Sequence, residues 1–220
     1  MGLHENAGPF CNMIFQLLFS HLMLKLIDKK GAFVLRIIAG HLKGRKFEVP
    51  KDKLIRPTSG KVKEALFSMV GPDLEGAVVI DLFSGTGSLG LEAVSRGAHK
   101  VYFGEKSKEG IQLTSKNITT CCTEDRCKLI KGDWEYVLAQ IHEPADLIFL
   151  DPPYKAGLME SCLEQIWERK LLAEDGIIAA EHDVHQKLPD YIGGFSIWKA
   201  RKYGNTVITL YTISSEETDL

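Results

Sequence analysis

From residue 77 to residue 182 the chain alternates between two hydrophobic patterns. Short runs that are apolar almost throughout, such as AVVIDLF (77–83) and DLIFLD (146–151), are typical of buried strands. Segments such as SLGLEAVSRG (88–97) instead carry apolar residues at helical spacing. Such an alternation, with strands apolar on both sides, predicts a parallel α/β sheet covered on both faces. The pattern predicts strands at 77–83, 100–105, 127–133, 146–151 and 176–182, and helices at 88–97, 107–118, 134–141 and 157–170.

The two ends of this region depart from the alternation. FSIWKARKY (195–203) and NTVITLYTI (205–213) meet at Gly204-Asn205, which predicts a tight hairpin adding antiparallel strands to the sheet edge. FVLRIIAGHLKGRKFEVP (33–50) predicts a small β-hairpin, and RPTSGKVKEALFSMV (56–70) predicts a helix. We therefore expect three regions: an N-terminal extension of unassigned role at 1–32, a basic hairpin at 33–57, and an α/β domain at 58–220.

Charge is distributed unevenly along the chain. Residues 1–70 hold 12 Lys/Arg and 5 Asp/Glu, a net charge of +7, whereas residues 71–220 hold 15 and 24, a net charge of −9. A basic front end on an acidic body indicates contact with a polyanion, although a solvated lysine-rich face explains the same counts.

The cysteines and the apolar segments limit the compartment and the class of protein that the sequence allows. The five cysteines are odd in number and unevenly spaced, which favours reduced thiols in a cytoplasmic protein over a disulfide framework. Because they form no CxxC pair and have no nearby histidine, we expect no metal site. The apolar segment 10–27 is interrupted by polar residues and lacks the features of a signal peptide, so we expect no membrane span.

A glycine-rich turn between the first predicted strand and helix indicates a cofactor site. Gly85, Gly87 and Gly90 have the GxGxxG spacing, and Glu105 ends the next strand, where a carboxylate can accept ribose hydroxyl protons. A close-packed turn beside a surface glutamate is the alternative. Asp81, just before the turn, would repel a pyrophosphate but could bind an ammonium, which favours S-adenosylmethionine over a dinucleotide.

Asp133, which ends the third predicted strand, and Trp134, which follows it, extend this site. Asp133 can accept from an adenine amino group, and Trp134 can pack on the ring. An N-cap for the following helix explains Asp133 equally well, and both roles can coexist.

The segment ADLIFLDPPYKAG (145–157) brings candidate chemistry to the same edge. Asp151 ends a buried strand, while Pro152 and Pro153 have fixed φ angles and no N–H donors. The Asp151 carboxylate and the Pro152 carbonyl are therefore two neighbouring acceptors, which suit the two protons of a substrate amino group. Tyr154 offers a face for a stacked base. The alternative is a strand that simply ends in a proline turn.

These motifs resemble a known family. DPPY matches the (D/N/S)PP(Y/F) motif of amino-directed methyltransferases, and DLFSGTGSLGLEA matches their cofactor motif. With RIIAGHLKGRKFEVP, RPTSGKVKEALFSMV and RKYGNTVITLY, five ordered blocks make the chain similar to the RsmD-type bacterial 16S rRNA guanine-N2 methyltransferases. Residues 1–32 depart from the family pattern, which usually lacks them.

The resemblance implies a class I S-adenosylmethionine-dependent methyltransferase fold, with a seven-stranded, mostly parallel sheet and an antiparallel last strand. It implies methylation of one guanine N2 amine in 16S rRNA, within the small subunit or an assembly intermediate, by a monomer. Three groups of residues are carried over by motif: Asp151, Pro152, Pro153 and Tyr154 for catalysis; Thr58, Asp81, Phe83, Ser84, Gly85, Thr86, Gly87, Glu105, Lys106, Asp133 and Trp134 for the cofactor; Arg36, Lys43, Arg45, Lys46 and Arg56 for RNA.

Three other functions remain open on the sequence. The DPPY motif also serves methylation of adenine N6 or cytosine N4 in DNA, although no target-recognition domain is apparent. A non-catalytic RNA-binding assembly factor and a dinucleotide oxidoreductase are the remaining alternatives.

Overall fold

The computed structural model describes residues 35–49, 60–121, 123–153 and 158–214, with only the backbone at Lys61. Four predictions lie outside these residues: the extension at 1–32, and the roles of Arg56, Thr58 and Tyr154. Contacts within the chain divide it into two units, Met1–Leu35 and Arg36–Leu220. Apart from Leu35, the first residue of β1, all described residues belong to the second unit.

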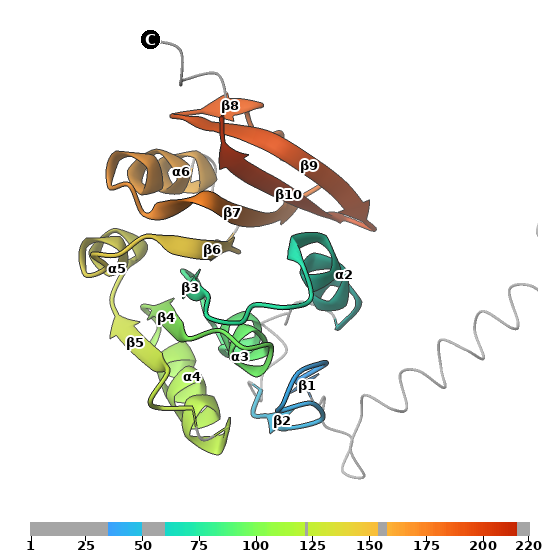
Figure 1. Cartoon of the computed structure of the whole chain (residues 1–220), viewed down its shortest axis with the longest axis vertical. Coiled ribbons are helices and arrows are strands. Elements are labelled where there is room, and N and C mark those ends of the chain that lie inside the picture. Colours follow the sequence, from blue (N-terminus) through green and yellow to red (C-terminus); the bar gives the residue numbers. More distant parts are fainter. Residues whose placement is uncertain (1–34, 50–59, 122, 154–157, 215–220) are drawn as a thin grey trace, which may run out of the picture. The chain divides into compact units, whose positions relative to one another are not determined.

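One mixed sheet forms the centre of this unit (Figure 1). Its strand order is β5-β4-β3-β6-β7-β10-β9-β8, and the first five of these strands are mutually parallel. Its strands are β3 (Val78–Asp81), β4 (Lys100–Glu105), β5 (Cys127–Lys131), β6 (Ala145–Leu150), β7 (Leu172–Asp183), β8 (Tyr191–Ile192), β9 (Phe195–Tyr203) and β10 (Thr206–Ile213). The helices are α2 (Gly60–Val70), α3 (Ser88–Ser95), α4 (Lys108–Cys121), α5 (Trp134–Ala139) and α6 (Leu158–Glu168). Among the described residues from 60 to 213, every predicted strand and helix is present, with ends that shift by up to four residues, as at β7, which begins at Leu172.

The C-terminal hairpin turns at Gly204-Asn205 and adds antiparallel strands beside β7, at the edge of the parallel part of the sheet, as predicted. β10 runs antiparallel between β7 and β9, so it is an inner strand and not an edge strand. The outer edge belongs to β8, a two-residue strand that pairs with the start of β9. The sheet therefore has eight strands where seven were predicted, because two residues are too few to give a periodic signal.

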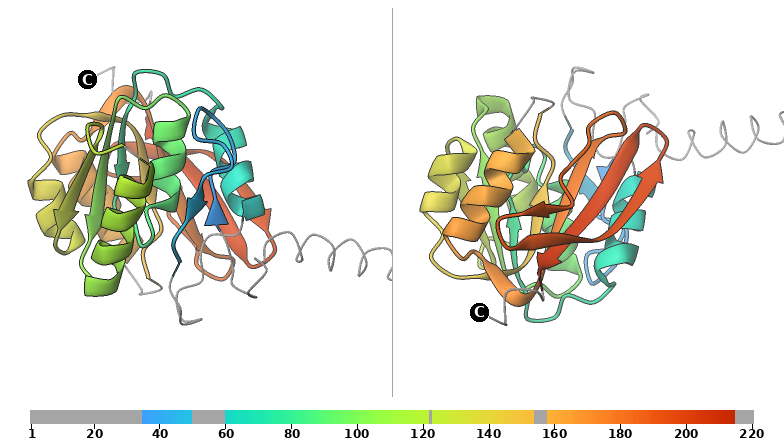
Figure 2. Two further views of the ribbon diagram at one scale, coloured as in Figure 1. Left: turned by 90° about the horizontal axis from the view of Figure 1, so that it is seen from below. Right: turned by 90° about the horizontal axis from the view of Figure 1, so that it is seen from above.

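Helices cover both faces of the sheet (Figure 2). On one face α5 and α6 contribute Val137, Leu138 and Leu163 to a core that includes Ile148 and Ala180 of the sheet. On the other face Phe67 of α2 meets Phe149 of β6 edge-on, with ring centroids 5.6 Å apart. A salt bridge between Lys63 of α2 and Glu92 of α3 places α3 on this same face.

A separate two-stranded sheet joins β1 (Leu35–Arg36) to β2 (Lys46–Phe47). Ile37 and Phe47 are buried. Because two-stranded hairpins are marginally stable alone in water, this predicted hairpin depends on the surface against which it packs.

No described helix combines the length and the apolar composition that crossing a membrane requires. Among the same residues, no group of three or more His, Cys, Asp or Glu side chains is placed to hold a metal ion.

Candidate active site at the carboxyl edge of the sheet

The carboxyl edge of the sheet, where the parallel strands β3 to β7 end, collects most of the predicted site residues. Gly87 has a φ of 77° and begins α3 from the left-handed region, which favours glycine. A Cβ on Gly90 would lie 2.2 Å from the Phe103 ring, so only glycine lets α3 pack this closely on β4. The loop after β3 thus has the tight turn and close packing that its spacing predicted.

Asp81 lies at the end of β3 and is buried. Its Oδ2 accepts a hydrogen bond from Gly90 N at 3.0 Å. Burial raises the pKa of the Asp81 carboxyl to about 7; the Gly90 N–H opposes this shift, and the negative charges of Asp151 and Glu105 add to it. The edge therefore holds an acceptor that a positively charged ligand group would stabilise in its ionised form.

Glu105 ties the glycine loop to β4. Its Oε2 accepts from Gly85 N at 2.9 Å, and its Oε1 accepts from Lys106 N at 3.0 Å and Ser107 N at 2.8 Å. A carboxylate has about four acceptor positions, so these three bonds leave capacity for one further donor. The side chain can therefore fix the loop and still bind a ligand hydroxyl.

Asp133 and Trp134 follow β5 at the same edge. Asp133 Oδ1 accepts from Tyr136 N at 3.0 Å, which confirms the alternative that Asp133 is the N-cap of α5. Trp134 is half-buried and packs against the core beneath α5. Gly132 N donates to Glu105 O at 2.9 Å, so the backbone segments that carry the Asp133 and Glu105 carboxylates adjoin each other.

The other loop residues divide into buried and exposed groups. Ser84 and Thr86 are buried; Ser84 Oγ lies 3.2 Å from Thr114 Oγ1, and the Thr86 carbonyl accepts from Asn117. Phe83 is half-buried against the core, whereas Lys106 is exposed. The side chains of Ser84 and Thr86 therefore act inside the protein, and their backbone groups shape the loop.

Asp151 and Pro152 follow the last residue of β6 and are half-buried, while Pro153 is exposed. The Asp151 charge acts on Asp81, so the two carboxylates, 70 residues apart in the sequence, face the same region. β3 and β6 are paired neighbours in the sheet, so the glycine loop and the Asp-Pro-Pro segment follow adjacent strands.

The basic hairpin presents Arg36, Lys43, Arg45 and Lys46 at its surface, all exposed. Arg45 also donates from Nη1 to the carbonyl of Thr120 at 2.7 Å, a contact that ties the hairpin to the end of α4.

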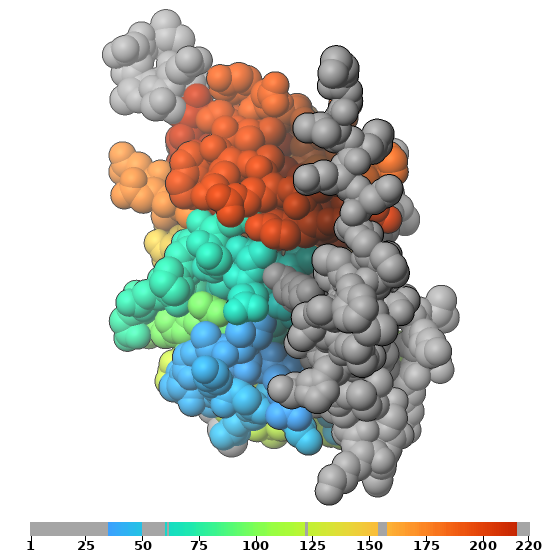
Figure 3. Space-filling view, turned by 90° about the vertical axis from the view of Figure 1, so that its right-hand side faces the viewer, coloured from blue at the N-terminus to red at the C-terminus, as the bar shows by residue number. Residues whose placement is uncertain are grey.

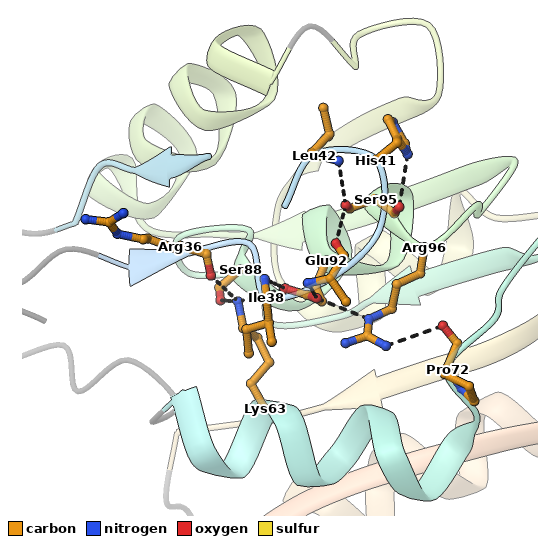
Figure 4. Close-up of polar contacts among 11 residues, drawn as sticks. Arg36, Ile38, His41, Leu42, Lys63, Pro72, Ser88, Glu92, Ser95 and Arg96 are labelled. Atoms are coloured by element: carbon orange, nitrogen blue, oxygen red, sulfur yellow. Dashed lines mark hydrogen bonds and ion pairs between the residues drawn. The ribbon is translucent and has the colours of Figure 1, made fainter. Parts of the chain in front are cut away.

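A buried polar network, which the sequence analysis missed, joins the hairpin to α2 and α3 (Figure 4). Glu92 is fully buried and accepts from Ile38 N at 2.8 Å and Ala39 N at 2.9 Å in the hairpin. It also pairs with Lys63 Nζ at 3.2 Å and with Arg96 Nε at 3.1 Å.

Lys63 reaches two further groups from the same position. Its Nζ donates to the Arg36 carbonyl at 3.1 Å and to Ser88 Oγ at 3.2 Å, and Ser88 directly follows the glycine loop. Burial lowers the pKa of the Lys63 ammonium, and Glu92 opposes that shift. The one available signal in the sequence was a charged residue, Glu92, inside the otherwise apolar run LGLEAV.

Similarity to known proteins identifies the family of this chain. A family model described as "Conserved hypothetical protein 95" matches residues 35–212. The chain belongs to this family. It is 37% identical over 180 residues to "Putative rRNA methyltransferase YlbH" of Bacillus subtilis, covering 80% of this chain and 98% of that protein. It is 31% identical over 188 residues to "Ribosomal RNA small subunit methyltransferase D" of Escherichia coli K12, covering 86% and 94%.

A solved structure supports the same family. "Putative methyltransferase yhhF from Escherichia coli" superimposes with a TM-score of 0.74 at 30% identity, covering 83% of this chain and 99% of that one. The resemblance to the RsmD-type family and the class I methyltransferase fold are thus confirmed.

Proposed function

We propose that the protein transfers a methyl group from S-adenosylmethionine to the exocyclic N2 amine of one guanine in 16S ribosomal RNA. The observation that carries this proposal is the meeting of Asp81 and Asp151 at the carboxyl edge, between the glycine loop and the donor-free Pro152-Pro153 corner. The names of the family members given above support RNA as the substrate.

The residues present at this edge fit S-adenosylmethionine by their chemistry. Asp81 would bind the ammonium of the methionine part, Glu105 would accept from one ribose hydroxyl, and Asp133 would accept from the adenine amine. These three groups are acceptors, and S-adenosylmethionine offers donors at each corresponding place. When bound, it supplies a methyl group on a sulfonium, which is a strong electrophile.

The chain's own contribution to the reaction is to orient a weak nucleophile. The lone pair of an aromatic amine is delocalised into its ring. In our proposal the Asp151 carboxylate and the Pro152 carbonyl each accept a hydrogen bond from one amine N–H, which turns the lone pair out of the ring plane and toward the methyl group. As the nitrogen–carbon bond forms, the methyl–sulfur bond breaks and its electron pair would stay on the sulfur of S-adenosylhomocysteine. The methylated nitrogen becomes acidic, and one of its protons would pass to the Asp151 carboxylate.

The base must leave its stack to reach this edge, so we expect it to be extruded from the RNA. Tyr154, outside the described residues, would stack on the base, a contact that contributes roughly 1–3 kcal/mol in related settings. Arg36, Lys43, Arg45 and Lys46 on the exposed hairpin would bind phosphates, with Arg56 as a further candidate.

Transfer of tritium from labelled S-adenosylmethionine, followed by nucleoside digestion, tests this function. We expect label in N2-methylguanosine when 16S rRNA or small subunits from cells lacking this gene are the substrate. Label in N6-methyladenine or N4-methylcytosine of DNA would contradict the proposal, and RNA binding without transfer would favour an assembly factor. Glu164→Ala, an exposed carboxylate on α6, serves as the control that should behave as the wild type.

A further inference from the structure

A third carboxylate, Glu181 of β7, occupies the position beside Asp151. The parallel register pairs Phe149 with Ala179 and Leu150 with Ala180. Continuing this register by one residue puts Asp151 next to Glu181. The neighbour on the other side is Ile208 of β10, which pairs with Glu181 and is fully buried.

Strand alternation decides which face Glu181 occupies. Leu150 and Ala180 lie in the core beneath α5 and α6. Because successive side chains of a strand point to opposite faces, Glu181 lies on the α2 face, as Phe149 does through its contact with Phe67. Glu181 is half-buried, and its Oε2 atom is shielded from solvent.

This position matters because bases differ beside their amino groups. Guanine carries an N1–H donor next to the N2 amine. Adenine carries an acceptor, N1, next to its N6 amine, and cytosine carries an acceptor, N3, next to its N4 amine. A second carboxylate adjoining the one that holds the amine therefore accepts a hydrogen bond from guanine and repels the lone pair of adenine or cytosine.

We infer that Glu181 is the specificity-determining residue of the proposed reaction and accepts the N1–H of the guanine whose N2 amine Asp151 holds. The inference rests on the proposed function. The Asp-Pro-Pro motif alone would hold the amine of any of the three bases. An acceptor beside it on β7 complements only guanine, which carries a second donor, N1–H, next to its amine.

The test replaces the target guanine of the rRNA by 2-aminopurine, which keeps the N2 amine but has an acceptor at N1. The target position comes from mapping the wild-type product, and the readout is kcat/KM for methyl transfer to each RNA. We expect the wild type to prefer guanine by on the order of 100-fold or more, since a site built for one hydrogen-bond donor rejects an analogue that lacks it. In Glu181→Gln the side-chain amide can donate to N1 of 2-aminopurine, so the preference should fall at least about tenfold.

Two controls separate recognition from structure. Glu64→Gln changes an exposed carboxylate of α2 and should keep the wild-type preference. Affinity for S-adenosylhomocysteine, measured by calorimetry, should be unchanged in Glu181→Gln, whereas a residue that merely supports the fold or the cofactor would lower it.

Three outcomes would overturn the inference. An unchanged preference in Glu181→Gln, with intact cofactor affinity, removes Glu181 from base recognition and leaves the proposed function standing. A loss of cofactor affinity without a change in preference assigns Glu181 to the cofactor. Absence of transfer to guanine by the wild type removes the proposed function and the inference together.

Discussion

Two carboxylates on the same face of the sheet, Glu92 and Asp81, are used in different ways. Glu92 is fully buried, and four donors fill its acceptor positions: two backbone N–H groups of the hairpin, Lys63 and Arg96. Asp81 is also buried, yet from the residues that the structure describes it receives one hydrogen bond, from Gly90 N. All acceptor positions of Glu92 are thus used within the protein, whereas Asp81 keeps acceptor positions for a ligand.

The difference separates scaffold from site. The Glu92 network joins the hairpin, α2 and the first residue of α3. In the space-filling view the hairpin (blue) and α2 (teal) lie next to each other (Figure 3). At the carboxyl edge, burial raises the pKa of Asp81, and the negative charges of Asp151 and Glu105 add to this shift. Like charges near one another are unfavourable in the free protein, and a ligand that brings donors or a positive charge relieves them.

The largest effect should come from the catalytic edge. Asp151→Ala removes the proposed acceptor of the amine proton, so we expect kcat for methyl transfer to fall by about 10³-fold or more. Calorimetry with S-adenosylhomocysteine should show nearly unchanged affinity. Lost cofactor affinity would instead make Asp151 part of the cofactor site.

The next effect concerns the scaffold. Glu92→Ala leaves the Lys63 ammonium buried beside Arg96 without its carboxylate, so unfolding should become easier by about 3–5 kcal/mol. Denaturation in urea measures this change. The half-exposed pair of Lys100 and Glu143 is the matched control, and Glu143→Ala should lower stability by at most about 1 kcal/mol. Similar decreases in the free energy of unfolding in the two variants would show that burial does not determine how strongly the Glu92 network stabilises the protein.

A third prediction uses the raised pKa of Asp81. A bound ammonium favours the ionised carboxylate, so affinity for S-adenosylhomocysteine should fall about tenfold per pH unit as pH drops below about 7. Stability of the free protein has the opposite sign: the folded state holds a proton on Asp81 that the unfolded chain has lost, so this contribution decreases as pH rises from about 4 to about 7. Both trends should flatten in Asp81→Asn, and a wild-type affinity that is level between pH 5.5 and 8 would contradict the role of Asp81.

The smallest effect belongs to the hairpin surface. Lys43→Glu combined with Lys46→Glu should weaken RNA binding at low salt and flatten its dependence on salt concentration, by a slope of about one per lost phosphate contact. Lys170→Glu, which changes an exposed charge in the loop between α6 and β7, is the control. An identical slope in the double variant and the wild type would mean that the hairpin charges are merely solvated.

The sequence could predict contacts between residues that lie close together along the chain, but not contacts between distant segments. The glycine loop, Asp81 and Glu105 lie within about one βαβ unit, and bonds such as Gly90 N to Asp81 span 9 residues, so a local motif implies them. The bond from Ile38 N to Glu92 spans 54 residues and depends on where the hairpin docks. Nothing in the residues near Glu92 names that partner, and the position of β10 between β7 and β9 is fixed in the same way by long-range pairing.

The most direct measurement is mass mapping of modified nucleosides in 16S rRNA from cells that lack this gene. We expect that one guanosine loses its N2 methyl group in these cells. Purified wild-type protein with S-adenosylmethionine should restore that group, and Asp151→Ala should not. An unchanged modification pattern, or a missing methyl group on any other base atom, would contradict the claim that this carboxyl edge methylates guanine N2.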